Sequence, residues 1–202
     1  MSSAQTTVES REIASSYNTI AAFFDAFPLP NARSYIASSL KAATSFKVWK
    51  KSVPVDLIYF IEKLEELLSA AFTITGNGCK REKALLSKTT NIPDISQYNF
   101  YCGWQSGLEA WHFFPRHLSA QEYFDPYKGL KKVTVWEDEK KCKQELKTIL
   151  HYALGPVPMS ETSIDMDVLK VHRLLHKLVE ACHLIDVRTN NRNNSSKINE
   201  HV

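Results

Sequence analysis

Glycine, proline and long apolar runs are scarce in this sequence of 202 residues. Its 6 Gly and 8 Pro stand mostly at the borders of long periodic segments, which disfavours a fold of many short strands. No window approaches the ~20 continuous apolar residues that a membrane-spanning helix needs. Met1–Ser10 lacks the basic and then apolar pattern of a secretory signal. The sequence therefore predicts neither export nor a membrane partner.

The cysteines exclude a further class of protein. Cys79, Cys102, Cys142 and Cys182 include no Cys-x-x-Cys pair, so a cysteine-rich zinc site is not expected. In a chain without an export signal, such cysteines are typical of reduced thiols. We therefore predict a cytoplasmic protein.

Motifs that mark common enzyme classes are also missing. The sequence has no glycine-rich phosphate loop, no HExxH and no GxSxG. Its net charge of +3 is well below that of a dedicated nucleic-acid binder. These absences favour a non-enzymatic protein that needs no cofactor.

What the sequence does show is helical periodicity. Apolar residues recur at three- and four-residue spacing over about residues 8–26, 30–46, 54–76, 96–114, 134–154 and 163–187. We predict an all-α fold, a helical bundle of about four long helices with two shorter N-terminal helices packed against it. Residues 1–187 would form a single domain. The polar, asparagine-rich residues 188–202 are expected to be a disordered tail.

Several shorter signals divide the second half of the chain. Ser119 and Glu122 form a capping-box pattern, which predicts a brief helical turn. Asp125-Pro126 and Gly129 then indicate a break. Thr134 and Glu137 repeat the capping-box pattern, so we expect the next long helix to open there.

Two Glu-x-x-His pairs, Glu109/His112 and Glu180/His183, fall on two of the expected long helices. Bundles with a two-metal site supply ligands from such pairs, so a divalent-metal enzyme with these four ligands is one alternative. At about 100° per residue, however, Glu109 and Glu180 point away from the apolar stripes and are expected to face solvent.

A second arrangement of metal ligands is visible on the last expected helix. His172, His176 and His183 form a line down one side of it, with Glu180 alongside. A metal site at a surface or in a groove is therefore another alternative, against the simpler interpretation of histidines packed at the edge of an apolar stripe.

Ten aromatic residues lie between Tyr98 and Tyr127, more than one helix face can bury. They either cap the bundle through the Pro115–Gly129 segment, line a ligand pocket or meet a partner. Large aromatics, Arg and His concentrate binding energy at protein interfaces. The candidate interface residues are Trp104, Trp111, His112, Phe113, Phe114, Arg116, His117, Tyr123 and Phe124.

Basic residues gather at Lys47, Lys50, Lys51, Lys80, Arg81 and Lys83. Solvated helix faces account for them most simply, and a nucleic-acid interface is the alternative. Taken together, the sequence favours a non-enzymatic, cytoplasmic, regulatory protein that binds another protein or itself through its aromatic region. A metal-dependent bundle enzyme and a helical nucleic-acid-binding protein are the two alternatives.

Overall fold

The chain folds into packed helices. The structure is a computed structural model that describes residues 3–76 and 110–199, and the side chains of residues 11–76 and 110–190. Within these ranges it holds seven α-helices and no strand, so the all-α prediction is confirmed. None of the described helices is both long and apolar enough to cross a bilayer.

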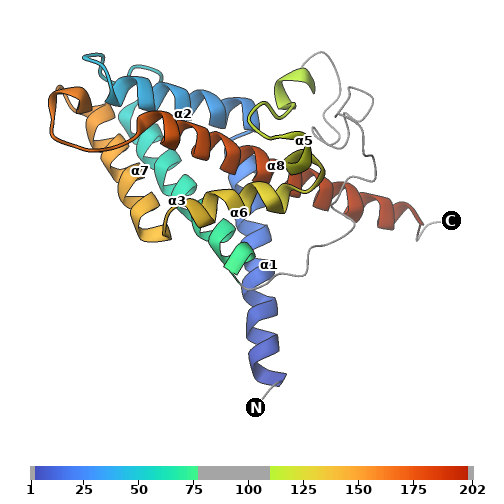
Figure 1. The fold of residues 1–202 in the computed structure, drawn as a ribbon. Helices are drawn as coiled ribbons and strands as arrows, with labels where there is room; N and C mark the ends of the chain where they lie inside the picture. The colour runs from blue at the N-terminus through green and yellow to red at the C-terminus, as the bar shows by residue number, and fades with distance from the viewer. Residues whose placement is uncertain (1–2, 77–109, 200–202) are drawn as a thin grey trace.

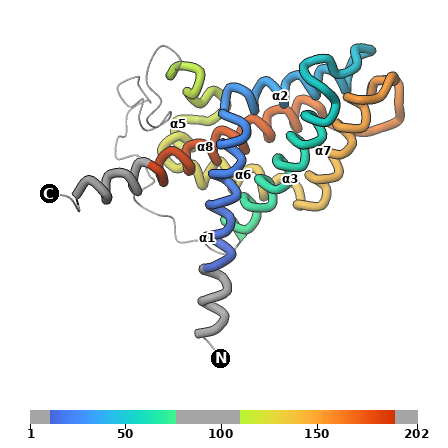
Figure 2. Tube along the Cα trace, turned by 180° about the vertical axis from the view of Figure 1, so that it is seen from behind, coloured from blue at the N-terminus to red at the C-terminus, as the bar shows by residue number. Residues whose placement is uncertain are grey.

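The last helix, α8 (Val168–Asn199), runs through the middle of the molecule. It lies between α2 (Leu29–Ala43) and α6 (Pro126–Trp136). α1 (Ser3–Ala26) crosses α8 on the side that faces away from the viewer in Figure 1 and toward the viewer in Figure 2. Every residue from 178 to 185 is buried, polar ones included. Because α8 is covered on several sides, a single apolar stripe does not describe what it buries.

Two more long helices complete the core. α3 (Pro54–Gly76) packs on α1 and on α7 (Glu139–Leu154), and α7 also packs on α2. Rings of Phe23, Phe27 and Phe60 meet at 5.1–6.2 Å between centroids where α1 reaches α3. Each side chain buried in this way contributes about 1.5–3 kcal/mol of hydrophobic free energy.

The N-terminal helices differ from the expectation that they are short additions to a bundle. α1 spans 24 residues, and α2 buries eight of its 15 residues. Pro28 precedes α2 and Pro30 occupies its first turn, where the missing N–H costs no hydrogen bond. Both helices are therefore part of the core.

The middle of the chain shows one confirmed signal and two wrong ones. Ser119 and Glu122 do form a capping box, which opens α5 (Ala120–Phe124). The expected break at Asp125-Pro126 and Gly129 is instead the start of α6, because Pro126 fits a first helical turn. A Cβ on Gly129 would lie 3.2 Å from Ala181 Cβ, so this glycine lets α6 approach α8 closely.

The second predicted capping box, Thr134 with Glu137, does not form. Asp138 caps α7 by accepting a hydrogen bond from the Lys141 N–H, and Val135, expected in the buried stripe, is 73% exposed. A 3₁₀ turn, η4 (Met159–Glu161), follows α7. The last helix begins at Val168 instead of Ser163.

The expected end of the last helix at Val187 also differs from the structure. α8 continues to Asn199, and Arg188 is 2% exposed and donates a hydrogen bond of 2.8 Å to the Tyr123 carbonyl. Arg188 is therefore part of the packed structure, and the disordered tail beyond it stays a prediction. Most of the predicted helix 96–114 lies outside the described residues, and its last part is a 3₁₀ helix, η3 (Ala110–Phe113).

Candidate metal centre

A segment without regular structure, residues 114–119, joins η3 to α5 and is tied to α2 by Arg33. The Arg33 guanidinium donates to two backbone carbonyls, that of His112 in η3 and that of Phe114 at the start of this segment, each at 2.8 Å. Arg33 itself is buried. One side chain thus fixes the path of the chain as it leaves η3.

The 114–119 segment is tied to α8 by Glu180, whose side chain is fully buried. Glu180 accepts from Arg33 at 2.6 and 3.0 Å and from the backbone N–H groups of Arg116 and His117 at 2.9 and 2.7 Å. Its Oε1 also lies 2.9 Å from Nδ1 of His117. This set of contacts, which we call the Glu180 node, joins α2, α8 and the segment.

The Glu180 carboxylate remains charged although it is buried. Burial alone would raise its pKa, but the hydrogen bond from His117 and the positive charge of Arg33 outweigh that effect and lower the pKa. Burial also lowers the pKa of Arg33, which the charge of Glu180 partly offsets. Backbone groups add hydrogen bonds to both members of the ion pair, as a buried pair requires.

Three histidines converge beside this node. His172 and His176 are four residues apart, so they share one face of α8, and His117 comes from the 114–119 segment. The ring centroids of His117 and His172 each lie 4.3 Å from that of His176. One ring nitrogen from each residue lies within 4.8 Å of the other two, which defines the three-histidine cluster.

His176 is the unusual member of the three-histidine cluster. It is 4% exposed, and neither Nδ1 nor Nε2 has a hydrogen-bond partner. A buried polar group without a partner costs about 1–3 kcal/mol, so it calls for an explanation. Burial, followed by the charges of His117 and His172, lowers the His176 pKa to about 3. The ring is therefore neutral, which is the form that binds a metal.

The cluster has the composition of a three-histidine metal site. Imidazole nitrogens suit Zn, Cu, Ni and Fe, and three of them with one open position are typical of catalytic zinc. Zn–N distances of about 2.0–2.1 Å bring ligand nitrogens to roughly 3.3 Å from one another, so the rings have to approach further on binding. The His117 side chain is 30% exposed, which gives an ion a path from solvent.

Glu180 fits this site as a supporting residue. Metal-bound histidines almost always give their second ring nitrogen to a carboxylate or carbonyl, which fixes the tautomer and orientation of the ring. Nδ1 of His117 makes this contact with Glu180, which leaves its Nε2 for a metal. Glu180 follows His172 and His176 at the same four-residue spacing along α8, so all three lie on one face.

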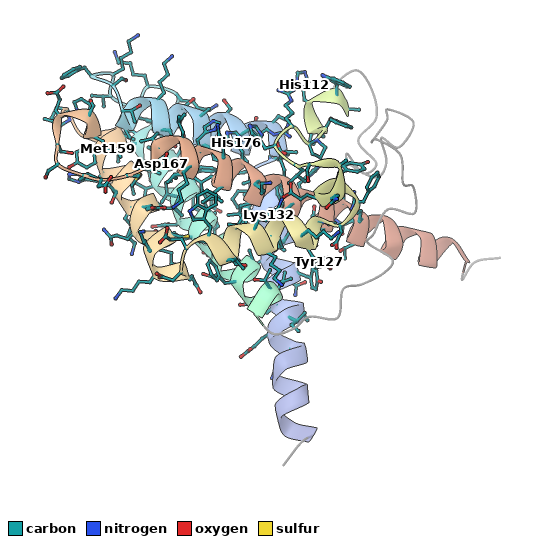
Figure 3. All side chains as sticks on the ribbon, viewed as in Figure 1. His112, Tyr127, Lys132, Met159, Asp167 and His176 are labelled. Atoms are coloured by element: carbon teal, nitrogen blue, oxygen red, sulfur yellow. The ribbon has the colours of Figure 1, made fainter. Side chains whose placement is uncertain are left out.

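The predicted metal ligands lie in different environments, and the described ones do not all gather at one site. Glu180 is 0% exposed, so the expectation that it faces solvent was wrong. The His183 ring packs against two aromatic rings, with its centroid 5.2 Å from that of Phe24 and 5.8 Å from that of Phe113. His112 is exposed on η3, away from His176 (Figure 3). Glu109 lies outside the described residues, so the predicted set of four ligands stays untested as a whole.

The predicted aromatic interface divides into buried and exposed members. Phe113 and Tyr123 are buried, whereas Trp111 is 57% exposed and stacks on Phe114 with centroids 5.6 Å apart. Phe124 packs against the core, and Arg116 is exposed. Trp104 lies outside the described residues. His117, also a candidate interface residue, is a member of the three-histidine cluster.

The predicted nucleic-acid set is only half described. Lys47, Lys50 and Lys51 lie in the connection between α2 and α3, whereas Lys80, Arg81 and Lys83 fall outside the described residues. The sequence did not predict Arg33 as a site residue, and it predicted His117 only as a candidate interface residue. Arg33 had no local signal, and His117 could be joined to His172 and His176 only through the fold. The comparisons add no relative to this site, since no protein-family model, curated protein or solved structure matches the chain.

Proposed function

We propose that this protein binds a divalent transition metal, most suitably zinc, through His117, His172 and His176. The observation that carries the proposal is the buried His176 ring, which has no partner on either nitrogen and touches two further histidines. A metal ion would coordinate one nitrogen of each of the three rings at once. These three ligands differ from the alternative set of four, Glu109, His112, Glu180 and His183, of which Glu109 lies outside the described residues.

The surrounding groups support a prepared site. Glu180 orients His117, and Arg33 holds the Glu180 carboxylate in place while also fixing the backbone at His112 and Phe114. Two of the three ligands stand on the rigid helix α8. When bound, a zinc ion with an open position supplies Lewis acidity and lowers the pKa of a coordinated water to about 7. The metal-dependent alternative among the functions considered is therefore the one this geometry favours.

The test is metal binding by the purified protein. We expect one Zn²⁺ per chain by calorimetry after chelator treatment, and Co²⁺ in its place with the intense visible absorption of a four-coordinate site. His176→Ala should weaken Zn²⁺ binding at least 100-fold. His151→Ala removes an exposed histidine on α7 and is the matched control.

The outcomes are distinct. Equal Zn²⁺ binding by His176→Ala and His151→Ala would overturn the site, as would the absence of any binding by the unaltered chain. Circular dichroism of each variant separates a lost ligand from a lost fold. His172→Ala provides a second variant in case His176→Ala does not fold, because His172 is only half-buried.

We also infer a second function, binding of another protein or a second copy of this chain, from the exposure of Trp111. A ring 57% exposed and stacked on Phe114 is a typical contact residue at interfaces. Trp111→Ala should abolish partner contact in a pull-down while changing the free energy of unfolding by less than about 0.5 kcal/mol. Free monomer alone by native mass measurement, with an unchanged pull-down, would count against it. A regulatory role and a cytoplasmic location stay predictions.

A further inference from the structure

The connection between α2 and α3, residues 44–53, forms a surface pocket at the end of the molecule opposite η3 and α5 (Figures 1 and 2). The connection is anchored, because the backbone N–H of Trp49 donates to the backbone carbonyl of Ala153 on α7 at 2.9 Å. The Trp49 ring packs on Tyr35 with centroids 5.5 Å apart. This pocket is separate from the three-histidine cluster and shares no residue with it.

The lining of the pocket is strongly basic. The pocket has a volume of about 150 Å³ and is lined by Ser38, Lys41, Ala42, Lys47, Val48, Trp49, Lys50 and Lys51. Four of these eight residues are lysines and none is acidic. One water needs about 10–15 Å³ of such space, so the pocket has room for a small hydrated anion.

Most of the lysine charge is uncompensated. The Lys51 ammonium donates to Ser34 and lies 4.9 Å from the Tyr35 ring centroid. Among the described residues, Lys41, Lys47 and Lys50 pair with no carboxylate. Lys41 also stands in the last turn of α2, where it offsets the negative end of the helix. The pocket therefore presents a net positive charge to solvent.

Trp49 supplies a second, independent observation. It is 6% exposed, and its indole N–H has no hydrogen-bond partner. An indole N–H can only donate, so it is satisfied only by an acceptor such as an oxyanion. Trp49 lines the pocket, so this buried donor without an acceptor, on a residue beside four lysines, points to an anionic ligand that carries several acceptor oxygens.

We propose that this pocket binds a phosphate group, as a phosphate monoester. Its double negative charge and three terminal oxygens match several ammonium groups and one N–H donor. Phe46, close to the lining residues in the chain, is 74% exposed, and Val48, in the lining itself, is 40% exposed. The same phosphate chemistry is therefore available from two sources, a soluble monoester or the headgroup of a lipid at a surface that Phe46 contacts.

The first experiment titrates the full chain with inorganic phosphate against chloride at equal ionic strength. The probe is the indole N–H resonance of Trp49, assigned by Trp49→Phe. We expect a saturable shift that chloride does not produce. Lys47→Gln with Lys50→Gln should weaken the binding at least 10-fold. Lys140→Gln with Lys147→Gln makes the same charge change on exposed residues of α7 and should leave it unchanged.

The second experiment identifies the source of the phosphate. Phosphatidylcholine vesicles are prepared with phosphatidic acid, a monoester, or with phosphatidylserine, a diester, and binding is measured by co-sedimentation. Preferential binding to phosphatidic acid that Phe46→Ser weakens, with the phosphate titration unchanged, supports the lipid source. Binding of inorganic phosphate without vesicle binding supports the soluble source. No Trp49 shift and no vesicle preference, or equal losses in both lysine pairs, would overturn the proposal.

Discussion

Two buried glutamates attach the chain between η3 and α6 to α8, and they do so in different ways. Glu180 is paired with Arg33, whose side chain is 9% exposed, and accepts backbone N–H groups from the 114–119 segment. Glu122 is paired with Lys177 and Lys132, whose side chains are 18% and 62% exposed. The Glu180 node lies inside the protein and touches the histidines, whereas the Glu122 contacts open to solvent.

This difference indicates what each glutamate does. Lysine ammonium groups can turn to water when their partner is lost, because their flexible stems let them do so. The Arg33 guanidinium has no such exit and would remain buried without its counter-ion. We therefore expect Glu122 to contribute to the fold alone, and Glu180 to contribute to both the fold and the metal site.

The largest effect should come from Glu180→Gln. It leaves Arg33 buried without a carboxylate, so we expect a loss of about 3–5 kcal/mol in the free energy of unfolding. It also weakens the contact that orients His117, so Zn²⁺ affinity should fall about 10- to 100-fold. Urea denaturation and calorimetry measure the two effects.

A double variant serves as the control for that result. Arg33→Met with Glu180→Met removes both charges and should be less destabilised than the sum of the two single changes. If the double loss equals the sum, the two groups do not act as a pair. Unchanged Zn²⁺ affinity in folded Glu180→Gln would separate Glu180 from the metal site.

Glu122→Gln should have a smaller effect, about 1–2 kcal/mol, with no change in Zn²⁺ affinity. Burial acts to raise the Glu122 pKa, but the hydrogen bonds from Lys132, Lys177 and Ser119 prevail and lower it to about 2. Since the folded-state pKa is the lower one, this stabilisation is present above the unfolded value of 4.5 and is lost as the pH falls toward 2. The difference in free energy of unfolding between the unaltered protein and Glu122→Gln should therefore be full at pH 7 and reduced at pH 3.

A third carboxylate, Asp186 on α8, extends the comparison. Its charge is expected to destabilise the fold, which is the opposite effect. Burial and the nearby charge of Asp25 raise the Asp186 pKa to about 6, and its hydrogen bond from Asn190 only partly offsets this. The folded state therefore favours the protonated form, so the charge destabilises the fold above pH 6. Asp186→Asn should increase the free energy of unfolding by about 1 kcal/mol at pH 8. The gain should disappear near pH 4, and a gain that persists there would contradict this explanation.

Elements whose signals are local could be predicted from the sequence. The expected ends of the first and third helices, at Ala26 and Gly76, agree with α1 and α3, and the Ser119 capping box forms. The Thr134 pattern failed because Pro126 had already started a helix and Asp138 offers a better cap. Such competition between neighbouring signals is decided by packing, which a local pattern does not contain.

In the candidate site too, residues near one another in the sequence could be predicted together, and residues far apart could not. His172, His176 and Glu180 stand at four-residue spacing on one helix, so their common face could be read from the sequence. His117 lies 63 residues from Glu180 in the chain, and Arg33 lies 147 residues from it. No periodicity joins residues so far apart. The burial of Glu180 does not follow from one apolar stripe either, because α8 is covered on several sides.

The two backbone amides that donate to Glu180 give access to a different property of the molecule, its local opening. The N–H groups of Arg116 and His117 are protected only while the 114–119 segment lies on α8. Their hydrogen exchange therefore reports the free energy of lifting this segment, separately from unfolding of the bundle. A metal bound to His117 and the two α8 histidines would have to be released on opening. At 100 times its Kd it would add about 2.7 kcal/mol to that free energy and slow exchange of both amides about 100-fold.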